Sequence, residues 1–194
     1  MSPRPLSVST ADILAATTRV VGRRGLAHLT LAGVSAEVGL APATLVQRFG
    51  SKRGLLVAVA AEASADVAGK FEAARRARES PVEALHTALA AIVADVDRPE
   101  TLANHLALLQ MDLSDPEFHQ LALDHWHAMH EGIRTLLEDA ARAGELVGCD
   151  PDRLAEAVRV TFDGAQINWA IRPRGPLQDR LRADVEFTLA PFRA

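Results

Sequence analysis

Glycine and proline residues divide this 194-residue chain into segments that carry apolar side chains at helical spacing. In the first segment the apolar face consists of Ile13, Leu14, Thr17, Val20 and Val21. Such intervals of three and four residues are typical of an α-helix with one buried face, and Thr10 is predicted to cap this helix. No segment alternates apolar and polar residues as a strand would, and Tyr is absent. The pattern therefore predicts an all-α fold.

Two short helices joined by a tight turn are predicted next. Thr30 suits the N-cap of the first helix, and Pro42 suits the first turn of the second. Gly39 tolerates the positive φ that the turn requires, and Ala36 is expected to be the small residue where the two helices cross. Helices of about two turns are unstable alone. They must therefore pack on the preceding helix and on a following one that Ser51 is predicted to cap and that carries Leu55, Leu56 and Val59.

Longer helices with short breaks are predicted after residue 80, where several begin at proline. Their expected ranges are 81–96, 99–113, 116–143, 151–170 and 177–192. We predict two domains on this basis. The N-terminal domain, called the head (residues 1–55), contains a three-helix helix-turn-helix unit, and a helical ligand-binding and dimerisation domain, called the body (residues 56–194), follows it.

Basic side chains are concentrated in the head, although the whole chain has a net charge of −4. The head has seven basic and two acidic side chains, a net charge of +5, whereas the body has a net charge of −9. The seven are Arg4, Arg19, Arg23, Arg24, Arg48, Lys52 and Arg53. A basic head on an acidic body indicates that only the head meets a polyanion. Chance variation in surface charge is the alternative.

The segment from Leu31 to Leu56, LAGVSAEVGLAPATLVQRFGSKRGLL, resembles the DNA-binding segment of the TetR family of bacterial regulators. The matching residues are Ala36, Gly39, Thr44-Leu45, Phe49, Ser51-Lys52 and Leu55-Leu56. The resemblance covers about residues 10–60, and beyond them only the number and length of the helices agree. It implies a homodimer on double-stranded operator DNA, which dimerises through its last two helices and often encloses a small-molecule effector.

The residues predicted to contact DNA lie on the second short helix and beside it. Leu45 and Phe49 should face inward, which leaves the rest of this helix free to enter a major groove. The predicted contact set is Thr30, Pro42, Ala43, Thr44, Gln47, Arg48, Lys52 and Arg53. Val46 stands where the family usually has Tyr, Arg48 where it often has an aromatic residue or His, and Ala41 where a capping Ser is common. Arg48 is expected to contact a base edge, for which guanine suits it best, or a phosphate. Lys52 suits a phosphate, whereas Arg53 suits either a phosphate or the solvated surface.

Two further sets in the body are predicted from helical spacing. The predicted dimer interface comprises Leu154, Val158, Thr161, Ala165, Leu177, Leu181, Val185 and Leu189; the alternative is ordinary intrachain core. The predicted ligand pocket comprises His105, Met111, Trp126, Met129, His130, Phe162, Gln166 and Trp169. Aromatic and Met residues at such spacing also occur as plain core.

Other chemistry has little support in the sequence. Four histidines cluster at positions 119, 125, 127 and 130, and His127 has a ligand spacing to His130 or Glu131. No HExxH pattern occurs and no Cys joins them, so surface or core histidines are expected, and neither a metal nor a cofactor is predicted. Cys149 is expected to be an inert thiol. Phosphate-binding glycine loops, nucleophile elbows and CxxC pairs are absent, and no apolar run is long enough for a signal peptide or a membrane span. We therefore predict a cytoplasmic, dimeric repressor that a small molecule releases from a palindromic operator. A helical protein-interaction module without DNA binding and an enzyme are the alternatives.

Overall fold

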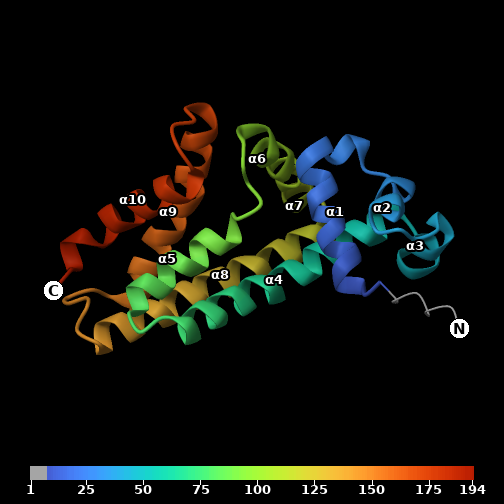
Figure 1. Ribbon diagram of the computed structural model, residues 1–194. Coiled ribbons are helices and arrows are strands. Elements are labelled where there is room, and N and C mark those ends of the chain that lie inside the picture. The colour runs from blue at the N-terminus through green and yellow to red at the C-terminus, as the bar shows by residue number, and fades with distance from the viewer. Residues whose placement is uncertain (1–7) are drawn as a thin grey trace, which may run out of the picture.

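The computed structural model describes residues 8–194, and the predicted basic residue Arg4 lies outside that range. The chain is helical throughout this part, apart from loops and one isolated β-bridge between Leu146 and Arg193. The elements are α1 (Thr10–Arg24), η1 (Leu26–His28), α2 (Leu31–Glu37), α3 (Pro42–Phe49), α4 (Lys52–Ala77), α5 (Pro81–Ile92), α6 (Pro99–Leu106), α7 (Leu109–Ser114), α8 (Pro116–Arg142), α9 (Pro151–Ile171), α10 (Leu177–Leu189) and η2 (Ala190–Phe192). The predicted all-α fold is confirmed. Figure 1 shows α1–α3 gathered at one end of the molecule and α9 and α10 at the other, with α4 and α8 running between them.

Side-chain caps fix the starts of the helices in the head. Thr30 accepts from the backbone N–H of Gly33 at 3.0 Å, and Ser51 accepts from that of Gly54 at 3.0 Å, as predicted. The prediction for α1 is wrong by one residue. Ser9 is the cap, and it forms a reciprocal capping box with Asp12 in which both backbone N–H groups are satisfied at 3.1 Å.

A compact apolar cluster holds the short helices in place. This head cluster consists of Ile13, Leu14, Val20, Val21, Leu29, Val34, Leu45, Leu55, Leu56 and Phe118. Phe118 comes from α8, so the cluster extends beyond the predicted head, and the predicted boundary at residue 55 falls inside the continuous helix α4. The small residue buried in α2 is Ser35, which is 1% exposed, whereas the predicted Ala36 faces solvent. The expectation for Ala36 was therefore wrong by one helical position.

The body has its own core between the long helices, with Phe71, Leu85, Ile133, Val158 and Leu181 among its buried members. The close approach of α4 and α8 depends on Gly132 of α8, because a Cβ atom there would lie 2.3 Å from the ring of Phe71. None of the helices between residues 8 and 194 combines the length and the apolar character that a membrane crossing needs.

The helix predicted over residues 99–113 is broken in the structure. α6 ends at Leu106 and α7 begins at Leu109, with a tight turn in which the N–H of Leu108 donates to the carbonyl of His105 at 3.0 Å. Because of this break, the segments before and after it pack in different cores. Leu102 is buried in the body core, whereas Leu108 and Met111 pack on the head cluster. No glycine or proline marks this turn. The ends predicted for α5 and α10 were also too late, because α5 stops at Ile92 and η2 replaces the last turn of α10.

We expect folding stability to fall as the pH drops below about 6.5, the ordinary pKa of histidine. His86 is buried, with its Nε2 atom 3.1 Å from Glu186. Burial holds the pKa of His86 below its ordinary value, although the Glu186 carboxylate opposes that shift. The unfolded chain therefore takes up a proton there before the folded chain does, so stability is lost as the pH decreases. Urea unfolding at pH 7.5 and pH 5.5 measures the effect. The difference in the free energy of unfolding between pH 7.5 and pH 5.5 should be smaller in His86→Gln than in the wild type. His28→Gln changes an exposed histidine and should leave that difference as it is in the wild type. An equal pH dependence in wild type and His86→Gln would contradict this assignment.

Candidate nucleic-acid interface

The outer face of α3 is open to solvent, as the sequence predicts. Leu45 is fully buried and Phe49 is half-buried, so these two residues anchor the helix. The exposed residues on the other side are Pro42, Ala43, Val46, Gln47 and Arg48, with Thr44 half-buried at the edge. No acidic residue occurs in the sequence from Gly39 to Arg53. A short, basic, exposed helix of this kind has the form that enters a major groove.

Two glycines set the angle of α3 to its neighbours. Gly39 has a φ of 68°, and the turn it forms is closed by the N–H of Leu40, which donates to the carbonyl of Ser35 at 2.9 Å. Gly50 has a φ of 71° and turns the chain sharply into α4. Residues with a Cβ atom rarely adopt this conformation. The helix-turn-helix geometry therefore depends on glycine at both positions.

Arg48 has a partner that the sequence did not indicate. Its Nη1 atom donates to the carbonyl of Val8 at 3.0 Å and holds the start of the described chain against α3. The side chain remains exposed. A guanidinium group has five N–H donors, so one such contact leaves others for a base edge or a phosphate.

Lys52 is also engaged inside the head. Its Nζ atom donates to the carbonyl of Leu26 at 2.7 Å, and the side chain is half-buried. This bond joins η1 to the start of α4 and helps to fix α1 relative to α3. The contact of Lys52 with a DNA phosphate stays a prediction, and the structure gives the residue a second role.

Arg53 points away from α3 toward the start of α8. Its Nη2 atom lies 2.8 Å from one carboxylate oxygen of Asp115 and 3.1 Å from the other, and its Nη1 atom pairs with Glu117. These carboxylates raise the pKa of Arg53, and Arg53 in turn lowers the pKa of Asp115. Five of the predicted contacts thus lie on α3, namely Pro42, Ala43, Thr44, Gln47 and Arg48, whereas Thr30 caps α2 and Arg53 pairs with the start of α8.

The acidic side chains of the head are both paired. Glu37 forms an ion pair with Arg23 at 2.7 Å, and its pKa is lowered by the hydrogen bond from that arginine. Asp12 is held in the capping box of α1, and its hydrogen bonds with Ser9 lower its pKa. Both carboxylates therefore stay ionised near neutral pH, and neither lies on the exposed face of α3.

The residues of the predicted dimer interface face the core of their own chain. Seven of its eight residues are buried against the body core: Leu154, Val158, Ala165, Leu177, Leu181, Val185 and Leu189. The eighth, Thr161, is half-buried, and its hydroxyl lies 3.0 Å from that of Thr188. A side chain that is fully buried within its own chain has no surface left for a partner. The structure therefore places most of this set in the intrachain core, which is the alternative that the sequence left open, whereas Thr161 and Ala165 also line a hollow between α9 and α10.

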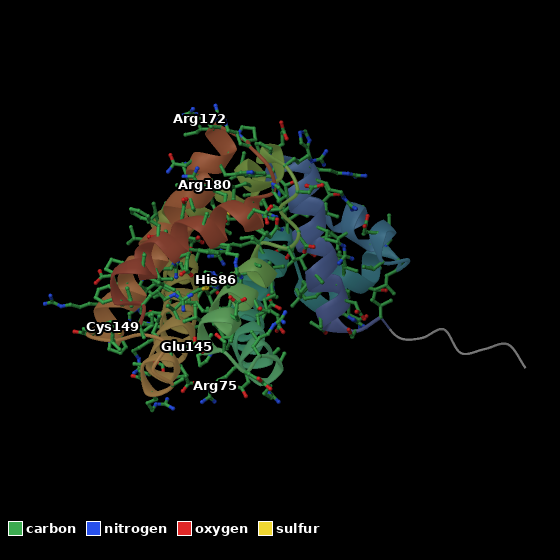
Figure 2. All side chains as sticks on the ribbon, turned by 60° about the vertical axis from the view of Figure 1, so that its left-hand side comes forward. Arg75, His86, Glu145, Cys149, Arg172 and Arg180 are labelled. Atoms are coloured by element: carbon green, nitrogen blue, oxygen red, sulfur yellow. The ribbon has the colours of Figure 1, made fainter. Side chains whose placement is uncertain are left out.

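The opposite sides of α9 and α10 expose large apolar residues. Val160, Ile167 and Ile171 follow one another at helical spacing on α9, with Val160 66% exposed. Phe187 of α10 is 83% exposed. A hollow of about 280 Å³ lies between the two helices and is lined by Gly164, Asn168, Arg180 and Phe187 among others; Arg180 is labelled in Figure 2. We call this surface the α9–α10 face. Large apolar side chains that stay exposed on two packed helices are typical of interaction surfaces.

The eight predicted pocket residues do not come together. Met129, Phe162 and Trp169 are buried in the body core, whereas His105 packs against Gly22 of α1 and Met111 packs on the head cluster. The remaining three are placed by other contacts. Trp126 is 39% exposed and stacks on His130, which lies 2.9 Å from Asp152, while Gln166 donates to the carbonyl of Phe162. The break after α6 separates His105 from Met111, and the rings of Phe162 and Trp169 pack in the body core.

The hollows of the body lie elsewhere. The larger, of about 490 Å³, is lined by Arg75, Arg78, Asp139 and Arg142 among others, at the end of α4 and the start of α5; Figure 2 labels Arg75. Neither this hollow nor the one on the α9–α10 face is lined by a predicted pocket residue. The half-buried thiol of Cys149 packs against the body core. In the part of the chain that is described, no group of three or more His, Cys, Asp or Glu residues could hold a metal ion.

Comparison with known proteins matches both parts of the chain. Residues 13–59 match the family described as bacterial regulatory proteins, tetR family, and residues 81–193 match the family described as BetI-type transcriptional repressor, C-terminal. The HTH-type transcriptional regulator BetI of Rhizobium meliloti (strain 1021) is 25% identical over 158 residues, which cover 81% of this chain and 75% of that protein.

Solved structures of low sequence identity share the fold. A TetR transcription regulator from Haloarcula marismortui ATCC 43049 has a TM-score of 0.76 at 15% identity, covering 95% of this chain and 98% of that one. A TetR transcriptional regulator from Streptomyces coelicolor has a TM-score of 0.73 at 20% identity, with the same coverage of 95% and 98%.

Proposed function

The chain belongs to the TetR family of bacterial transcriptional regulators, and we propose from this premise that it is a homodimeric repressor which a small molecule releases from a palindromic operator. Members of this family are DNA-binding regulators and not enzymes, so the enzyme alternative is set aside. The relative BetI is likewise named as a transcriptional regulator. The dimer, the operator and the release are the parts that we propose.

The exposed face of α3 carries the proposal. It combines Gln47 and Arg48, which can read base edges, with small residues at Pro42 and Ala43 that allow close approach to DNA. Burial of Leu45 fixes the rotation of the helix, so these side chains cannot turn inward. The second alternative, an interaction module without DNA binding, does not explain why a face of this kind is exposed and free of acidic residues.

The α9–α10 face supports dimerisation. A twofold axis through it would place the same apolar patch on both sides, which is the usual symmetry of a homodimer. We propose that this axis also places the two heads on the same side of the assembly. Two recognition helices related in this way read half-sites that are inverted copies of each other, so the operator should be palindromic.

A contact between α6 and α1 supports release by a small molecule. Asn104 of α6 donates to the carbonyl of Gly22 in α1 at 2.9 Å, so a shift of α6 in the body reaches the head directly. A ligand releases DNA only if it binds the DNA-incompetent form more tightly. A tenfold release requires about 1.4 kcal/mol of coupling between the two sites. Thermal-shift screening of small metabolites, followed by operator displacement, would identify such a ligand.

Selection of duplexes from a random-sequence pool by the wild-type protein tests the proposed function. We expect enrichment of a palindromic duplex, bound by two chains, with an affinity that falls as salt increases. Enrichment of no sequence would favour the interaction module. Enrichment of a single half-site bound by one chain would contradict the dimer.

We expect Gln47→Ala and Arg48→Ala to change which bases are preferred within the half-site. Loss of a bidentate contact to a base edge costs about 1–3 kcal/mol at that base pair and relaxes specificity there. The measurement is a repeat of the duplex selection with each variant. Arg76→Ala serves as the control, because it removes an exposed arginine from the body and leaves α3 unchanged. An unchanged consensus in both α3 variants would show that another face reads the bases.

A further inference from the structure

We infer that Arg53 is a positioning residue, which ties the head to the start of α8, and not a ligand of DNA phosphate. The inference rests on the proposed DNA-binding function and concerns how the reading face is held. Arg53 is the second residue of α4 and follows α3 closely in the chain, which is why the sequence suggests a phosphate contact. Its side chain instead joins segments that lie 62 residues apart.

The first observation is the shape of the ion pair. Both carboxylate oxygens of Asp115 accept from the same guanidinium nitrogen, and Glu117 accepts from the other. Asp115 is also the N-cap of α8, where its Oδ1 atom accepts from the backbone N–H of Glu117 at 3.0 Å. Arg53 therefore binds the cap itself, so the first turn of α8 and the first turn of α4 are fixed relative to each other.

The second observation is the aromatic ring beneath the ion pair. The guanidinium carbon of Arg53 lies 5.4 Å from the centre of the Phe118 ring, and Phe118 is buried in the head cluster. Guanidinium groups are attracted to aromatic faces at this separation. A planar fork that stacks on a ring and pairs with two carboxylates cannot be replaced by a lysine ammonium, which is a point charge.

The third observation is the local charge. Two carboxylates surround one guanidinium, so the Arg53 site as a whole carries an excess negative charge. A phosphate that approached Arg53 would also approach the carboxylates of Asp115 and Glu117, which are bonded to it. The site thus repels the ligand that the sequence suggested, while it stabilises the junction between α4 and α8.

α8 connects the Arg53 contact in the head to the far end of the body. The helix spans 27 residues from the head cluster to the far end of the body, and it packs along α4 and α9. The angle at which α8 leaves the head therefore sets the position of the recognition helix relative to the α9–α10 face. In a dimer that face would fix the distance between two heads, so loss of the Arg53 contact should weaken operator binding without removing any DNA contact.

The test compares Arg53→Gln, Arg53→Lys and the double variant Asp115→Asn/Glu117→Gln, with Arg76→Gln as a control for charge on α4. The probe is the palindromic duplex that the wild type selects, titrated over a range of salt concentrations. A positioning role predicts that all three variants lose affinity by a similar factor of about 10 and keep the wild-type salt dependence. The combination of Arg53→Gln with the double variant should lose no more than either alone, because both remove one contact.

A phosphate contact predicts different results. Arg53→Gln would then flatten the salt dependence by about one unit, Arg53→Lys would retain most of the affinity, and Asp115→Asn/Glu117→Gln would bind more tightly because it frees the guanidinium. Any of these three results overturns the inference.

Hydrogen exchange of the DNA-free protein gives a second measurement that does not depend on the operator. Arg53→Gln should accelerate amide exchange in residues 117–119, the first turn of α8 after Pro116, but Arg76→Gln should not. Unchanged exchange would contradict the positioning role of Arg53. If the wild type selects no duplex, the proposed function is refuted. The exchange experiment would still show whether Arg53 holds the start of α8 against the head.

Discussion

The Phe187→Glu variant is expected to be a folded monomer. Phe187 is 83% exposed in the single chain, so a glutamate there meets solvent and leaves the body core intact. In the proposed dimer the same side chain lies on the twofold interface, where an unpaired buried charge costs several kcal/mol. Light scattering should report the mass of one chain, while circular dichroism should remain that of the wild type.

Operator binding by this monomer should be weaker by a factor of about 100 or more. Two linked heads bind with an avidity that exceeds single-head binding by 10²–10⁴ when both half-sites are engaged. Val185→Glu is the matched control, since it makes the same charge on the other side of α10. Val185 is fully buried in the chain, so this variant should lose its fold and not only its partner. A Phe187→Glu protein that remains dimeric would place the interface away from the α9–α10 face.

The two sides of α9 and α10 show where sequence reasoning reached its limit. Both sides of these helices carry apolar residues, and the stripe at Leu181 and Val185 was the more regular one. Regular spacing indicates that a helix buries a face but does not say whether its own chain or a second copy covers it. The buried stripe serves the body core, and the less regular residues Ile167 and Phe187 are left exposed.

The recognition helix was predictable because its signals are local. Thr30 and Ser51 cap the flanking helices, Gly39 and Gly50 adopt positive φ, and Leu45 faces inward, and each of these depends on neighbours within a few residues. The partners of the charged residues were not predictable. Asp115 is far from Arg53 in the chain, and no spacing rule connects them. The break after α6 was missed for the same reason, since two separate cores and not a glycine or proline create it.

Trp169→Ala is expected to lower the free energy of unfolding by about 3–5 kcal/mol, the usual cost of removing a large buried aromatic side chain. Trp169 is 5% exposed, packs in the body core, and donates from its indole N–H to the carbonyl of Gly175 at 3.0 Å. The substitution therefore leaves a cavity in the body core and removes the hydrogen bond from Trp169 to the loop before α10. Chemical denaturation followed by circular dichroism measures the loss.

The second tryptophan provides the control. Trp126 is 39% exposed and stacks on His130 at the surface of α8, so Trp126→Ala should cost about 1 kcal/mol or less. Phe162→Ala should behave as Trp169→Ala does, because Phe162 is buried in the same core. The structure thus assigns Phe162 and Trp169 to stability and not to the wall of an effector site, which the sequence had suggested. If Trp169→Ala were as stable as Trp126→Ala, the region around α9 would contain space that a ligand could fill, and the effector site would have to be sought there.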